Sequence, residues 1–70
     1  MISFTVGPNV ISMAIDATGI DEFTTWLRSV QRDGGHIHLR SKLAGGDELA
    51  ETSPWGAKAV DEVIIDYIDE

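Results

Sequence analysis

The stretch TGIDEFTTWLRSVQRDGG, residues 18–35, predicts an amphipathic helix against which the rest of the chain should pack. Its large apolar side chains fall at helical spacing and form a single stripe, made of Ile20, Phe23, Trp26, Leu27 and Val30. Thr18 is the expected N-cap, and Asp21 lies in the first turn, where the helix dipole favours negative charge. The helix should end at DGG, residues 33–35, because glycine adopts the left-handed capping conformation without strain.

Residues 2–16, which precede the helix, predict a β-hairpin. Apolar side chains at every second position mark its two strands, Ile2, Phe4 and Val6 in the first and Ile11, Met13 and Ile15 in the second. The turn is GPN, residues 7–9, because proline fixes φ while glycine and asparagine tolerate positive φ. Both strands should direct their apolar side chains to one side, as in a sheet that is covered on a single face.

Two further strands are expected after the helix. The first is HIHLR, residues 36–40, with apolar and polar side chains on opposite faces. The second spans residues 60–68, and its Val63, Ile65 and Tyr67 should face the helix, whereas Ile64 and Ile68 lie on the other face. The connection between them, residues 41–58, is long for a compact domain, and loops of this length are often functional.

These elements give the order ββαββ, an α+β fold in which one four-stranded antiparallel sheet carries the helix on one face. The 70 residues form a single domain, residues 1–70, close to the lower size limit for independent folding. The chain has no cysteine and therefore neither disulfides nor a thiolate zinc site. The open sheet face and the two sheet edges would suit a homodimer, which would enlarge the thin core.

Twelve acidic and five basic residues give the chain a net charge of -7. An acidic surface disfavours nucleic acid and anionic membranes and speeds association with basic proteins, although it also serves solubility alone. The longest apolar run, residues 63–65, is far too short to span a bilayer, and the N-terminus does not have the pattern of a secretory signal. We therefore expect a soluble, cytoplasmic protein that binds neither nucleic acid nor membrane.

The sequence does not assemble a catalytic or metal site. His36 and His38 share one strand face and could supply two ligands to zinc, copper or iron, but no third ligand is placed by the sequence. Cross-strand pairing of these histidines with Glu62 or Asp66 is the favoured interpretation. No serine lies in a nucleophile elbow, and no glycine-rich phosphate loop is present. The expectation is a protein that is not an enzyme and has no catalytic residue, bound metal or cofactor.

The segment 43–56 is the best candidate for binding another protein. It combines three glycines with the acids Asp47, Glu48 and Glu51 and one large aromatic residue, Trp55. Tryptophan is enriched at interface hot spots, and acids provide charge complementarity to a basic partner. The alternative is that Trp55 folds back over the edge of the small core.

The motif GHIHL, residues 35–39, followed by GGDEL, residues 45–49, resembles the immunity protein 32 family of bacterial polymorphic toxin systems. The resemblance covers residues 23–68, and His36 and His38 match the family most directly. The family tryptophan precedes the glycine pair, whereas Trp55 follows it. The resemblance implies a non-catalytic protein that binds and neutralises a cognate toxin domain, and an acidic inhibitor suits a basic nuclease toxin.

Two other functions remain open. One is a small structural or regulatory homodimeric subunit that uses the open sheet face as its interface. The other is a metal-binding protein that uses His36 and His38. The genes beside this one would separate these functions, because an adjacent toxin gene favours immunity and an enzyme operon favours the subunit.

Overall fold

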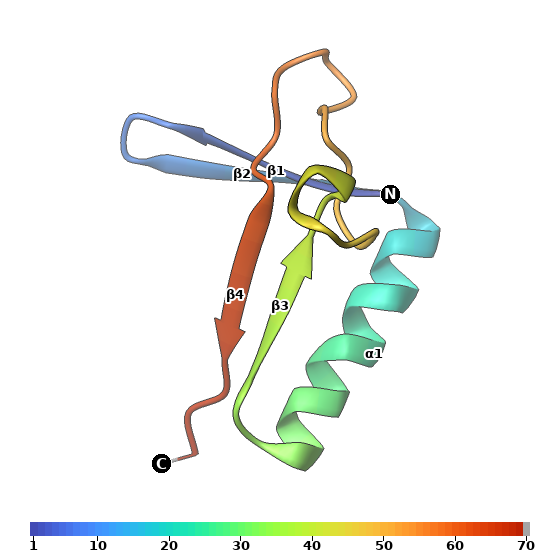
Figure 1. Cartoon of the computed structure of the whole chain (residues 1–70), viewed down its shortest axis with the longest axis vertical. Coiled ribbons are helices and arrows are strands. Elements are labelled where there is room, and N and C mark those ends of the chain that lie inside the picture. The colour runs from blue at the N-terminus through green and yellow to red at the C-terminus, as the bar shows by residue number, and fades with distance from the viewer. Residues whose placement is uncertain (70) are drawn as a thin grey trace.

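The computed structural model describes residues 1–69 and contains one α-helix and two separate two-stranded antiparallel sheets (Figure 1). The elements are β1 (Ile2–Gly7), β2 (Val10–Ile15), α1 (Ala17–Asp33), β3 (His36–Arg40), the short 3-10 helix η1 (Lys42–Ala44) and β4 (Glu62–Asp66). The expected order of two strands, a helix and two strands is confirmed. The expected single four-stranded sheet is wrong, because β1 pairs only with β2 and β3 only with β4.

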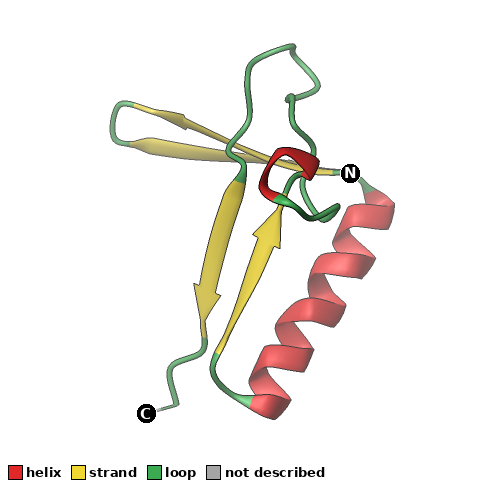
Figure 2. Ribbon diagram, in the orientation of Figure 1, coloured by secondary structure: helices red, strands yellow, loops and turns green. Residues whose placement is uncertain are grey.

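The loop between β3 and β4 occupies one of the two edges of the first hairpin, so the second hairpin cannot pair there. Its backbone occupies the outer edge of β1, where a third strand could pair. The N–H of Ala50 donates to the carbonyl of Ile2 at 2.8 Å, and the N–H of Val60 donates to the carbonyl of Phe4 at 2.8 Å. The long loop and the crossing of the two hairpins are visible in Figure 2. Loop backbone therefore takes a place at which a neighbouring strand could have paired.

The first hairpin forms as predicted, but only its base is covered. Its apolar residues pair across the strands, Ile2 with Ile15, Phe4 with Met13 and Val6 with Ile11, so they share one face. Ile2 and Phe4 are buried, whereas Val6 and Ile11 are 67% and 73% exposed. The expectation of a fully covered face is therefore wrong, since the tip of the hairpin projects beyond the helix and the loop (Figure 1).

Each end of α1 is capped by a hydrogen bond. The helix begins at Ala17 with Asp16 as its N-cap, whose Oδ1 accepts the N–H of Gly19 at 2.8 Å. The expectation that Thr18 is the cap is wrong, because the carboxylate two residues earlier reaches the first turn. The predicted end is confirmed, with Gly34 at φ 77° donating to the carbonyl of Val30 at 2.8 Å. Within residues 1–69, no helix is long and apolar enough to cross a membrane.

The core lies where the two hairpins, α1 and the loop meet. Its buried centre is made of Ile2, Phe4, Leu39 and Leu49. Phe23 and Trp26 of α1 pack against this centre and are partly buried, while Ile20 and Leu27 remain exposed. The predicted helix stripe is thus only partly buried, because a two-stranded sheet is too narrow to cover its whole width.

Gly19 marks the closest approach of α1 to the first hairpin. A Cβ at this position would collide with the carbonyl oxygen of Met1 and would lie 2.8 Å from Ile15 Cγ1. In an open helix, replacing glycine by alanine stabilises by about 1 kcal/mol. Here we expect Gly19→Ala to lower the free energy of unfolding by about 1–3 kcal/mol, as overpacking does.

Chemical denaturation of this variant would check the contact. Thr24→Ala, on the exposed side of the same helix, is the matched control and should be at least as stable as the parent. A Gly19→Ala variant that is more stable than the parent would contradict the close packing.

Candidate functional site

In the loop between β3 and β4, residues 41–61, the first and the last residue are hydrogen-bonded to each other. The buried Ser41 donates its N–H to the carbonyl of Asp61 at 2.9 Å and its hydroxyl to Asp61 Oδ1 at 2.8 Å. The Ser41 hydroxyl, and next the ammonium group of Lys58, hold the pKa of Asp61 below its usual value. The loop is therefore anchored at its base, and its other residues are positioned from there.

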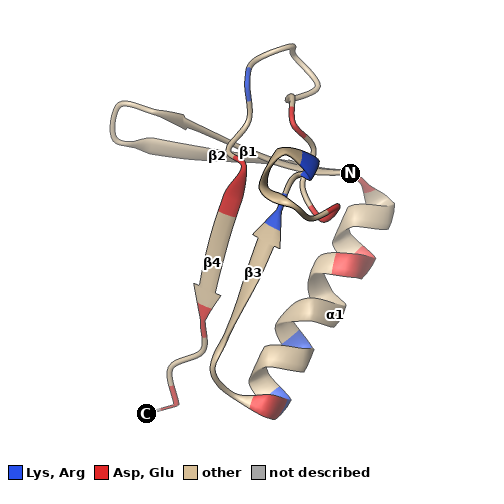
Figure 3. Ribbon diagram, in the orientation of Figure 1, with Lys and Arg blue, Asp and Glu red and all other residues tan. Residues whose placement is uncertain are grey.

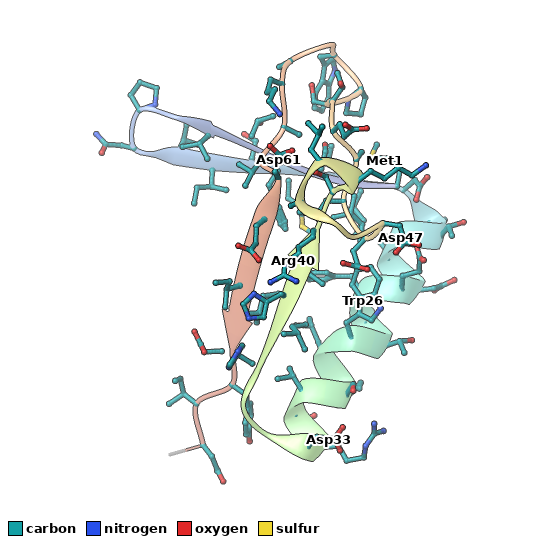
Figure 4. The ribbon with its side chains drawn as sticks, in the orientation of Figure 1. Met1, Trp26, Asp33, Arg40, Asp47 and Asp61 are labelled. Carbon is teal, nitrogen blue, oxygen red and sulfur yellow. The ribbon has the colours of Figure 1, made fainter. Side chains whose placement is uncertain are left out.

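A second anchor lies at Arg40, where the middle of the loop docks on β3. Glu48 Oε1 accepts the backbone N–H of Arg40 at 3.0 Å, and this bond is the main reason why the pKa of Glu48 is lowered. The N–H groups of Glu48 and Leu49 donate to the carbonyl of Arg40 at 3.0 and 3.1 Å. Glu48 thus has a structural role, because it docks the loop on β3, whereas the neighbouring Asp47 is exposed (Figure 4).

The outer part of the loop is a tight turn organised by one buried serine. A β-bridge between Thr52 and Lys58 closes the turn. Inside it, Ser53 donates its N–H to the carbonyl of Ala57 at 2.8 Å. The hydroxyl oxygen of Ser53 accepts the N–H groups of Trp55 at 3.3 Å and of Ala57 at 3.1 Å. Three hydrogen bonds of Ser53 therefore organise the backbone that carries Trp55.

Trp55 lies at the tip of this turn and is 79% exposed. The alternative that it covers the edge of the core is therefore wrong. The position of Trp55 could not be predicted from the sequence, because the hydrogen bonds of Ser53 shape a turn that points away from the core. Sequence reasoning missed Ser53, although Ser-Pro before Trp-Gly is a recognisable signal for a turn.

The two histidines of β3 lie on its polar face and pair with the acids of β4. His38 Nδ1 is 3.1 Å from Glu62 Oε2, and His36 Nδ1 is 4.0 Å from Asp66 Oδ1. The two imidazole rings meet edge to face, with centroids 4.9 Å apart. The predicted cross-strand pairing is confirmed. Among residues 1–69, no group of three or more histidine or acidic side chains is arranged to hold a metal ion.

Glu62 contacts both His38 and Arg40 on this polar face. Arg40 Nε donates to Glu62 Oε2 at 2.6 Å, and this bond, followed by the contact with His38, lowers the pKa of Glu62. The folded state therefore favours the carboxylate. Its contribution to stability is present above the ordinary pKa of glutamate and is lost as the pH falls through the lowered pKa.

We expect Arg40→Gln to raise the pKa of Glu62 towards its ordinary value. A carbon-detected NMR titration of the Glu62 carboxyl would measure this change. His38→Gln is the matched control and should raise the same pKa less, because its contact is the weaker cause. A Glu62 pKa that is unchanged by Arg40→Gln would contradict the ion pair.

A small pocket of about 230 Å³ opens between α1 and β3. Its lining residues are Trp26, Ser29, Ile37, His38, Leu39 and Glu48. Figure 4 places Trp26 on the side of α1 that faces β3. Ligand pockets in proteins usually have volumes of about 300–1,000 Å³. The pocket is therefore small for an organic substrate.

The structure distributes the predicted binding residues over three places. His36 and His38 lie on β3, Asp47 and Glu48 lie near the Arg40 anchor, and Glu51 and Trp55 lie in the outer part of the loop. Glu51 is exposed, and its carbonyl accepts the N–H of Ala59 at 3.0 Å. Hydrogen bonds therefore hold the loop where it carries Glu51 and Trp55. No protein-family model, curated protein or solved structure matches the chain.

Proposed function

We propose that the chain is a non-catalytic immunity protein that binds a cognate bacterial toxin domain through residues 43–56 and neutralises it. The main support is Trp55, 79% exposed on a turn that the buried Ser53 holds in place. Interfaces draw most of their binding energy from a few residues, among which tryptophan is enriched. A turn that is ordered before binding loses less entropy when the partner docks.

Charge gives the proposal its second support. Asp47 and Glu51 are exposed on the same loop, and the whole chain carries a net charge of -7. A nuclease toxin has a basic face that contacts nucleic acid, so an acidic inhibitor would be attracted to that face and exclude the substrate. The partner in this proposal is therefore a basic toxin domain.

The motif that resembles the immunity protein 32 family has a structural role in β3 and in the loop that follows it. GHIHL, residues 35–39, covers most of β3, and GGDEL, residues 45–49, docks the loop on Arg40. A Cβ at Gly46 would lie 2.7 Å from Arg40 Cβ, so the docking requires a glycine. In this proposal the motif fixes the loop, and the exposed Asp47, Glu51 and Trp55 make the specific contacts.

Co-expression with the toxin encoded beside the gene tests the function. Cells that carry the parent should survive, and cells that carry Asp47→Lys with Glu51→Lys should lose most of the protection, because reversed charges slow association with a basic partner. Glu48 is left unchanged, since its reversal would break the hydrogen bond to Arg40.

Glu22→Lys with Asp69→Lys is the matched control. It makes the same change in net charge at exposed positions outside the loop and should still protect. A parent that protects against no toxin encoded beside it would refute the proposal. Equal loss of protection in the two double variants would refute the role of the loop.

A further inference from the structure

The first hairpin ends in an apolar tip that none of the described residues covers. The exposed apolar side chains are Val6, Val10, Ile11 and Met13. A two-stranded hairpin is at best marginally stable by itself, and three or more strands or a packed face are usually needed. At its base the hairpin has such packing, but at its tip it does not (Figure 1). The tip is therefore the part of the first hairpin that further strands would stabilise most.

The outer edge of β2 also has free backbone groups. The carbonyls of Ile2 and Phe4 accept hydrogen bonds from the loop and so point out of the hairpin. Their register partners are Ile15 and Met13, and residues opposite each other in an antiparallel pair both point inward or both outward. The backbone groups of Met13 therefore face away from β1, and those of Ile11 do so as well, two residues earlier. Within residues 1–69, no other backbone segment bonds to them.

Charge indicates which partner fits this edge. All twelve acids and five bases of the chain lie at or after position 16, so the hairpin has no charged side chain (Figure 3). Edge strands are commonly protected by charged residues, as in β4 with Glu62 and Asp66. Two copies with a net charge of -7 repel each other wherever their acids meet, and the hairpin is the surface where they do not.

We propose that β2 pairs with β2 of a second copy of this chain across a two-fold axis. The product is a continuous four-stranded antiparallel sheet in the order β1-β2-β2-β1. A two-fold contact places the same surface on both sides, which an uncharged apolar edge satisfies. In the register that we propose, Ile11 lies opposite the partner's Met13, and Ser12 lies opposite the partner's Ser12. The dimer leaves the loop with Trp55 free, so each copy keeps its own binding surface.

Sedimentation equilibrium of the full chain tests the dimer. The parent should have twice the monomer mass of 7.6 kDa at the upper end of a concentration series. Ile11→Lys and Ile11→Glu should both give monomers, because a charge of either sign would lie against the partner's Met13 and about 7–8 Å from its own counterpart across the axis. Ile11 is mostly exposed, so both variants should keep the circular dichroism spectrum of the parent. Ile64→Lys, at an exposed position of the second hairpin, is the matched control and should remain dimeric.

A parent that stays monomeric at its highest soluble concentration would overturn the proposal. So would a dimer that survives both Ile11 variants, because the contact would then lie elsewhere. If only one sign of charge disrupts the dimer, the contact is not the symmetric one that we propose.

A cysteine at position 12 tests the register. The chain has no cysteine, so Ser12→Cys introduces a single thiol. In the proposed register the two Cβ atoms are about 4.5 Å apart, within reach of a disulfide. The variant should form a covalent dimer on mild oxidation, whereas Thr24→Cys, on the exposed face of α1, should not. Equal cross-linking of the two variants would contradict the register.

Discussion

Leu39→Ala is expected to destabilise this domain strongly and to lower its melting temperature by about 8–40 °C. Leu39 is 2% exposed and lies in the core with Ile2, Phe4 and Leu49, which come from the first hairpin and the loop. Removing a buried leucine side chain destabilises by about 2–5 kcal/mol. Domains of this kind have only about 0.05–0.15 kcal/mol of stability per residue, so this loss takes about half of the total. Thermal unfolding followed by circular dichroism would measure it.

Leu43→Ala is the matched control for this variant. Leu43 lies on η1 and is exposed, so its truncation should change stability by no more than about 0.5 kcal/mol. Trp26→Ala should lie between the two, because Trp26 is only partly buried. If Leu39→Ala melts within a few degrees of the parent, Leu39 does not join the two hairpins as described.

Trp55→Ala should weaken toxin binding strongly but change the stability of the chain little, unlike Leu39→Ala. Its side chain is 79% exposed, so the free energy of unfolding should change by no more than about 0.5 kcal/mol. If Trp55 anchors the toxin, binding should weaken by at least about 2 kcal/mol, which is roughly 30-fold in Kd. Calorimetry with the purified toxin domain would give the affinity, and denaturation of the free chain would give the stability.

Ile68→Ala controls for the loss of an exposed apolar side chain. Ile68 is 68% exposed but lies after β4, outside the loop. It should bind the toxin as the parent does. An unchanged affinity for Trp55→Ala would remove Trp55 from the interface, and a large loss of stability would mean that Trp55 supports the fold.

The features that the sequence predicts well depend on residues close together in the chain or on a regular alternation. This class includes the first hairpin with its turn, the end of α1 at Gly34 and the pairing of His38 with Glu62. In each of them the side-chain types that determine the structure are visible in the sequence. The N-cap differs because Asp16 and Thr18 are both suitable, and only the geometry of the turn selects Asp16.

The split into two sheets could not be predicted, because it depends on backbone groups that every residue has. Ala50 and Val60 occupy the edge of β1 through their N–H groups, and neither side chain indicates this. The position of Trp55 is similar, since the hydroxyl of Ser53 directs the turn outward. Binding residues on a long loop are therefore harder to place from sequence than residues on strands.

Titration of the purified chain with the purified toxin domain encoded beside its gene bears directly on the proposed function. We expect saturable binding with one toxin domain per chain, and loss of toxin activity at that ratio. The affinity should fall as salt rises, because exposed charge pairs are screened beyond about 10 Å at 0.1 M. Failure to bind any toxin domain encoded beside the gene would contradict the immunity function, as would binding that leaves the toxin fully active.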